Sequence, residues 1–161
     1  MISVRQGLWE TNSSSMHVLT IGTNSKYDLP VPEKLVIRYT MFPHEDVIDN
    51  DVQSRLNVVV KLIMSSDVCQ QGLYRLMHFI DYIKTKGVRV DTDWDSFCLY
   101  SIGWCDTCET IFKKKDPYDI LWKYITNSRG LFTVDIWDHE ESRLQKIKDD
   151  RDMQVIIMSR E

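Results

Sequence analysis

Residues 52–63, VQSRLNVVVKLI, decide the fold class because their apolar side chains recur at the spacing of an amphipathic helix. The apolar stripe consists of Val52, Leu56, Val59, Val60 and Ile63. Asn50 or Asp51 precedes it and can cap the first turn with a side-chain oxygen. The sequence therefore predicts a helix that buries one side and leaves the other in solvent.

A second helix is expected directly after the first, with the same spacing of apolar residues. Its stripe consists of Leu73, Leu76, Met77, Ile80 and Ile83. Ser66 or Asp67 can cap its start, and Gly87 can end it in a left-handed conformation. We expect the two stripes to pack against each other and against one face of a sheet.

Two shorter helices are expected near the C-terminus. Asp116-Pro117 is typical of a helix start, because aspartate caps helices and proline is favoured in the first turn. Gly130 lies just past the end of that helix. The other helix is short and charged, and it carries Leu144 and Ile147 on its apolar side.

Strand patterns surround these helices. The clearest is residues 16–22, where alternate side chains belong to opposite faces of a pleated strand. The other expected strands cover residues 2–9, 35–40, 88–91, 97–104, 131–137 and 153–158. The last is an apolar strand, so we expect it inside the sheet. The prediction is an α+β (mixed α/β) fold, with a single mixed β-sheet and about four helices packed on it, in one domain over residues 1–161.

Composition narrows the classes of function. Hydrophobic residues make up 43% and charged residues 27% of the 161 residues, which favours a globular chain over a disordered one. The formal net charge of −4 disfavours general nucleic-acid binding and membrane-surface binding, although Lys113-Lys114-Lys115 forms a local basic run. We find no apolar stretch that spans a bilayer and no secretory signal at the start, and we expect a cytoplasmic protein.

The candidate ligand site is the polar run of residues 10–15, followed by His17. Its hydroxyls, amide and turn N–H groups suit a phosphate, to which Arg5 would add a charge-assisted fork. The predicted ligand-binding residues are Arg5, Thr11, Asn12, Ser13, Ser14 and Ser15. Glu10 and His17 are the candidate catalytic residues, as acid, base or orienting group. The alternative is an ordinary turn, since such side chains also bond their own backbone.

The cysteines are candidate metal ligands. Cys105 and Cys108 have the spacing of a zinc knuckle, and Cys98 would be a third ligand. A structural zinc would need a fourth ligand from Cys69, His78 or His139. The alternatives are a redox Cys-x-x-Cys at a helix start and unligated buried thiols.

The polar run also carries a resemblance. Trp9-Glu10-Thr11-Asn12-Ser13-Ser14-Ser15-Met16-His17 resembles the opening of a group of phage and bacterial proteins, which reads aromatic-Glu-Thr-Asn-Ser-Ser-Ser-x-His. The likeness covers about the first twenty residues, and Trp9 stands where the group often has phenylalanine. It implies a phage or prophage source and a site at the polar run and His17, without implying a reaction.

Three functions follow as hypotheses. The first is a phage accessory protein that binds a phosphate-bearing small molecule, a nucleotide, through the polar run, in host takeover or counter-defence. The second is a nucleotide- or NAD-dependent transferase or hydrolase at the same site. The third is a protein inhibitor or adaptor that binds a host enzyme. The ligand, the oligomeric state and the biological target are left open by the sequence.

Overall fold

The computed structural model describes residues 16–40, 50–65, 69–99, 106–136 and 141–160. Within these residues the chain forms five α-helices, five strands and two short 3-10 helices. The predicted α+β class is confirmed, with one more helix than the four expected. The strand expected at residues 2–9 lies outside the described residues.

A three-stranded antiparallel sheet is built around β1 (Met16–Gly22). β4 (Phe132–Ile136) pairs with one side of β1, and β5 (Met153–Arg160) pairs with the other. The expectation that the last strand lies inside the sheet is therefore wrong for the described strands. Ile157 of β5 is buried in the main core, whereas Met158 is 40% exposed, so the apolar composition of a strand does not by itself place it inside a sheet.

A second sheet contains two parallel strands, β2 (Lys34–Ile37) and β3 (Arg89–Thr92). The chain between them forms α1 (Val52–Met64) and α2 (Cys69–Thr85), which make the crossover that parallel strands need. The described strands thus form two sheets rather than the single mixed sheet expected. Periodicity reveals strands but not their partners, which explains the difference.

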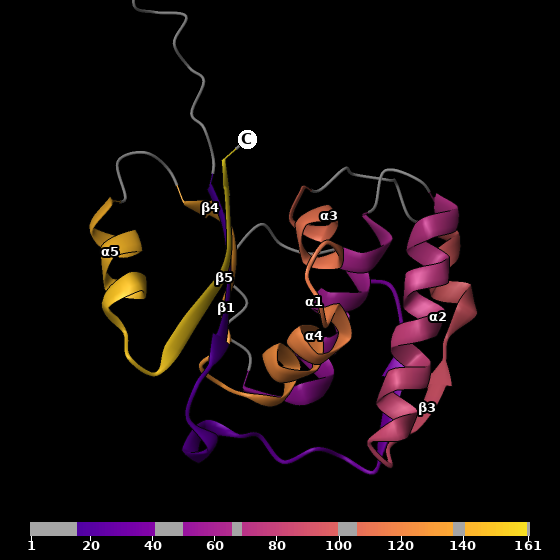
Figure 1. Ribbon diagram of the computed structural model, residues 1–161. Helices are drawn as coiled ribbons and strands as arrows, with labels where there is room; N and C mark the ends of the chain where they lie inside the picture. The colour runs from indigo at the N-terminus through magenta and orange to yellow at the C-terminus, as the bar shows by residue number, and fades with distance from the viewer. Residues whose placement is uncertain (1–15, 41–49, 66–68, 100–105, 137–140, 161) are drawn as a thin grey trace, which may run out of the picture.

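The larger sheet is covered on both faces, as Figure 1 shows. α5 (Glu141–Asp149) lies on one face. The other face is turned toward α1, α3 (Asp106–Phe112) and α4 (Pro117–Thr126). α2 and the β2–β3 sheet form the side of the molecule farthest from α5.

The side chains of β1 point alternately to the two faces of the larger sheet, and helices cover both faces. Leu19 and Ile21 belong to the main core, which they share with the helices of one face. Val18 points the other way and joins a smaller apolar cluster with Ile147 of α5. Each fully buried side chain of this size contributes about 1.5–3 kcal/mol of hydrophobic free energy. β1 is therefore buried on both of its faces.

The local signals of α1 are confirmed. The Asp51 side chain accepts a hydrogen bond from the Ser54 backbone N–H at 3.0 Å, as an N-cap should. Leu56, Val60 and Ile63 are completely buried. Proline is also at the start of α4, as expected, but Asp116 makes no side-chain cap there.

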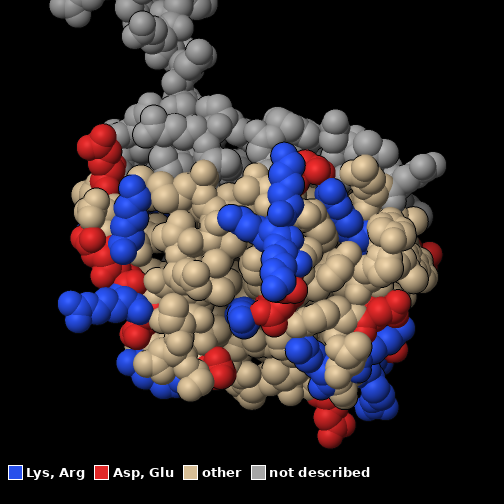
Figure 2. Space-filling view, in the orientation of Figure 1, with Lys and Arg blue, Asp and Glu red and all other residues tan. Residues whose placement is uncertain are grey.

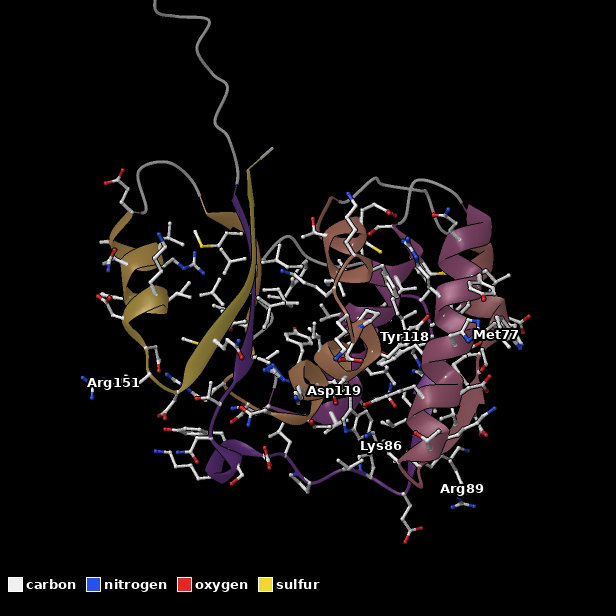
Figure 3. The ribbon with its side chains drawn as sticks, viewed as in Figure 1. Met77, Lys86, Arg89, Tyr118, Asp119 and Arg151 are labelled. Carbon is white, nitrogen blue, oxygen red and sulfur yellow. The ribbon has the colours of Figure 1, made fainter. Side chains whose placement is uncertain are left out.

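In α2 the stop signal is confirmed, while the buried stripe is narrower than expected. Gly87 has φ +81°, the left-handed conformation that ends a helix at low steric cost. Leu76 and Ile83 are fully buried, but Leu73 and Met77 are each 43% exposed. Met77 lies on the side of α2 turned away from α4 (Figure 3). The apolar pattern of α2 extends beyond the stripe that neighbouring elements cover.

The strand expected at residues 97–104 is wrong in its described part, because Trp94–Leu99 forms the 3-10 helix η2. The Asp93 backbone N–H donates to the Ile37 carbonyl, and the Ser96 N–H donates back to Asp93. These bonds turn the chain at the end of β3 before another strand can start. Among the described helices, none has the length and apolar character needed to cross a membrane.

Candidate functional site

Most of the predicted ligand site lies outside the described residues. This applies to Arg5, Glu10 and Thr11, and to Asn12-Ser13-Ser14-Ser15. His17 lies in β1, where its backbone is opposite Ser159 of β5. The site therefore stays a prediction, with one end fixed by the sheet.

The strand partners show where the polar run joins the fold. Met16, the first residue of β1, is opposite Ile136 of β4 and opposite Arg160 of β5. Both partners are at the C-terminal ends of their strands. Met16 therefore lies in the central strand of the sheet, at the edge where β4 and β5 end.

Of the three predicted zinc ligands Cys98, Cys105 and Cys108, only Cys108 has a described side chain. Cys98 is in η2, and Cys105 lies outside the described residues. The Cys108 thiol is fully buried in α3, 3.8 Å from the Ile63 carbonyl oxygen and 3.7 Å from a terminal nitrogen of Arg75. Among the described residues, no three His, Cys, Asp or Glu side chains lie together in a way that could hold a metal ion.

Arg75 holds the surroundings of this thiol together. Its two terminal nitrogens donate to both carboxylate oxygens of Glu109, at 2.7 and 3.2 Å. The hydrogen bond to Glu109 raises the pKa of Arg75 above its usual value. The guanidinium also lies over the Phe112 ring, 4.3 Å from the ring centroid. These contacts join α2 to α3, so we assign Arg75 a structural role.

The described surface mixes charges of both signs. Figure 2 shows acidic and basic side chains interspersed over one face of the molecule. Lys113, Lys114 and Lys115 are exposed in the connection between α3 and α4. The local basic run noted in the sequence is therefore a solvated part of the surface.

A hollow of about 450 Å³ opens between the end of β1, the η1 region and α4. η1 (Ser25–Tyr27) is a short 3-10 helix that follows β1. Twelve residues line this η1–α4 hollow, among them Asp28, Leu29, Trp122, Lys123 and Asn127. Their separation along the chain explains why sequence patterns did not reveal the site. The one local signal is the polar stretch Thr126-Asn127-Ser128 after an apolar helix.

Asn127 holds the wall of the hollow in place. Its side chain is 4% exposed, and its Oδ1 accepts a hydrogen bond from the Arg129 backbone N–H at 3.0 Å. This bond orients the amide, so that Nδ2 donates to the Asn24 carbonyl oxygen at 3.1 Å and to Asp28 Oδ1 at 2.9 Å. Asn127 therefore joins η1 to the end of α4 and aligns the Asp28 carboxylate.

Gly22 leaves the space that Asn127 occupies. A Cβ at position 22 would overlap the Asn127 side-chain amide. Glycine at the end of β1 is thus required for this close approach.

A charged pair lies at another part of the lining. Asp119 accepts a hydrogen bond from the Tyr82 hydroxyl at 3.0 Å, and its other oxygen is 2.7 Å from Lys123 Nζ. The Lys123 bond lowers the pKa of Asp119, and the same bond raises the pKa of Lys123. Figure 3 shows Asp119 on the side of α4 that faces α2, with Lys86 beyond the end of α2.

Comparisons of the chain with models of protein families, with curated proteins and with solved structures found no match. Function must therefore be inferred from the residues and the geometry of this chain.

Proposed function

We propose that this chain is a phage-encoded accessory protein that acts in the host cytoplasm and binds a nucleotide through the polar run, residues 10–15, and His17. The ligand is a phosphate-bearing small molecule. Binding would sequester a host signal, in takeover of the cell or in counter-defence. The phage source comes from the resemblance of residues 9–17, and the ligand class comes from the chemistry of the run.

The observation that supports this proposal is the position of β1. His17 is part of a strand that has hydrogen-bonded partners on both sides. A loop that continues from such a strand has one end anchored to a rigid element, which favours a preorganised site. The register also puts Arg160 opposite Met16, so an arginine is found in the strand next to the start of β1.

The chemistry of the run suits phosphate without a metal. Backbone N–H groups of a turn form a concave donor nest, and serine hydroxyls add further donors. The guanidinium of Arg5 would bind two phosphate oxygens at once. Glu10 and His17 would orient the ligand, or would move a proton if the site also catalyses a transfer or a hydrolysis.

Isothermal titration against a panel of ribonucleotides and cyclic nucleotides tests the proposal. We expect one nucleotide to bind, and the Ser14→Ala, His17→Ala double variant to lose about tenfold or more in affinity. Ser142→Ala, at an exposed position on α5, is the matched control and should bind normally. Absence of binding across the panel, or unchanged binding by the double variant, contradicts the proposal. Mass spectrometry of the same mixtures distinguishes binding from turnover.

An inhibitor or adaptor that binds a host protein is a second candidate, because α2 exposes apolar side chains. Leu73 and Met77 are each 43% exposed and Tyr74 is 65% exposed. Exposed large apolar groups that lie together favour a protein contact. If this is the function, a stoichiometric host partner should be captured by the wild type and lost in a Leu73→Glu, Met77→Glu variant. Gln71→Glu is the control on the same helix, at an exposed position.

A further inference from the structure

We propose that the η1–α4 hollow is a second binding site, for a small molecule that carries a protonated amine on an aromatic or apolar body. This inference is independent of the nucleotide site. β1 runs from Met16, next to the polar run, to Gly22, which lines the hollow. Seven residues of strand span roughly 20 Å, so one small ligand does not fill both places.

The size of the hollow fits a small molecule. Its volume of about 450 Å³ lies within the range of roughly 300–1,000 Å³ that is usual for ligand sites. The hollow is open to solvent, so a ligand has a path of entry. Its walls come from segments about one hundred residues apart, which Asn127 holds together through its bonds to Asn24 and Asp28.

Asp28 supplies the polar anchor. Within the described residues its carboxylate accepts one side-chain hydrogen bond, from the neutral amide of Asn127, and makes no ion pair. The carboxylate is aligned but not neutralised, and further acceptor positions stay open. A protonated amine is the ligand group that matches such an acceptor, since charge-assisted hydrogen bonds are stronger than neutral ones.

The apolar part of the lining favours a ligand with an aromatic or apolar group. Leu29, Val31 and Trp122 line the same hollow. Val31 is 40% exposed, and both Leu29 and Trp122 are partly buried against the core. An indole ring offers a flat surface for an aromatic ring and an attractive face for a cation.

The charge of the lining excludes a phosphate as the preferred ligand. The charged side chains are Asp28, Asp119 and Lys123, which sum to −1. Lys123 is already bonded to Asp119, at 2.7 Å. A phosphate would therefore meet the carboxylate of Asp28 without a free cation to offset it. An ammonium group would complete the charge balance.

Tryptamine and tryptophol are the probes that test this inference. Both carry an indole on a two-carbon chain, and they differ in having an ammonium or a hydroxyl at the end. Each probe is titrated into the full chain at neutral pH, and binding is measured by calorimetry. We expect tryptamine to bind about tenfold or more tightly than tryptophol. Equal affinity for the two probes, or no tryptamine binding at millimolar concentration, overturns the inference.

Two substitutions locate the site. Asp28→Asn keeps an oxygen that can accept the Asn127 hydrogen bond but removes the charge, so tryptamine affinity should fall about tenfold with tryptophol unchanged. Val31→Arg introduces a cation at an exposed position of the lining and should also abolish the preference for tryptamine. Asp91→Asn, an exposed carboxylate in β3, is the control. Unchanged tryptamine binding by both Asp28→Asn and Val31→Arg contradicts the assignment.

The nucleotide variants separate this inference from the proposed function. Ser14→Ala, His17→Ala should bind tryptamine as the wild type does. Conversely, Asp28→Asn should leave nucleotide titration unchanged. Loss of tryptamine binding in the Ser14→Ala, His17→Ala variant would show that the two proposed sites are not independent, and would overturn the second site as stated.

Discussion

The guanidinium of Arg55 donates from both terminal nitrogens to the backbone carbonyl of Gly130, one of these bonds being 2.7 Å long. Arg55 is 1% exposed, and its guanidinium also lies over the Tyr124 ring, 4.9 Å from the centroid. Gly130 is just before β4, while Arg55 is in α1. One side chain therefore links the helical layer to the strand that flanks β1.

Replacing Arg55 by methionine should destabilise the fold by about 2–4 kcal/mol, since the buried Gly130 carbonyl would lose both donors. Urea unfolding followed by circular dichroism measures the change. Arg89→Met is the control, because Arg89 is 75% exposed and its ion pair with Glu33 is long, at 3.8 Å. We expect the control to shift the free energy of unfolding by less than about 0.5 kcal/mol. An equal effect of the two substitutions would contradict the role given to Arg55.

Gly22→Ala should cost about 2–3 kcal/mol, because the new Cβ displaces the Asn127 amide from its three hydrogen bonds. Gly87→Ala gives the comparison, since a Cβ there has nothing within 4 Å and the cost comes only from its positive φ. That cost is about 1 kcal/mol. Thermal unfolding of the two variants should rank Gly22→Ala as the less stable, and the reverse order would refute the packing described for Asn127.

Neighbouring residues of α2 should respond differently to truncation. Leu76→Ala removes a fully buried side chain and should cost about 2–4 kcal/mol. Met77→Ala removes one that is 43% exposed and should cost less than about 1 kcal/mol. Chemical denaturation measures both values. Similar losses at the two positions would mean that Met77 is buried in solution.

Acid should weaken the bonds of Asp119. Its pKa is lowered chiefly by the Lys123 hydrogen bond, so its contribution to stability is complete above the ordinary pKa of 3.8. That contribution is lost as the pH falls below this value and through the lowered pKa. Because the pair is partly exposed, we expect a contribution below about 1 kcal/mol. Unfolding free energies measured from neutral pH down to about pH 2 should show a smaller acid-induced loss in Asp119→Asn than in the wild type.

The features of the fold that depend on neighbouring residues were predictable from sequence. The Asp51 cap, the proline at the start of α4 and the left-handed Gly87 each depend on residues within one or two turns. The alternation in residues 16–22 likewise shows the two faces of β1. Such signals act over a few residues, because the backbone groups involved lie beside them in the chain, although the expected Asp116 cap does not form.

The pairing of strands and the η1–α4 hollow were not predictable, because distant residues create them. Asp28 and Asn127 are 99 positions apart, and neither belongs to a recognisable motif. Leu73 and Met77 were expected in the core because periodicity shows which residues form the apolar stripe of a helix. It does not show how much of that stripe is buried by neighbouring elements. For the polar run the sequence supplied the chemistry and the described strands supply only its point of attachment.

The covering of the larger sheet by α5 has a consequence for how the molecule opens. α5 packs on the sheet through a small cluster in which Val18 and Ile147 are buried, while most of its other side chains are exposed. Few apolar contacts hold it, so amide protons of α5 should exchange with deuterium well before those of α1. Its transient release would expose one face of β1 and β5 to solvent. This partly open form would be the species most prone to aggregate.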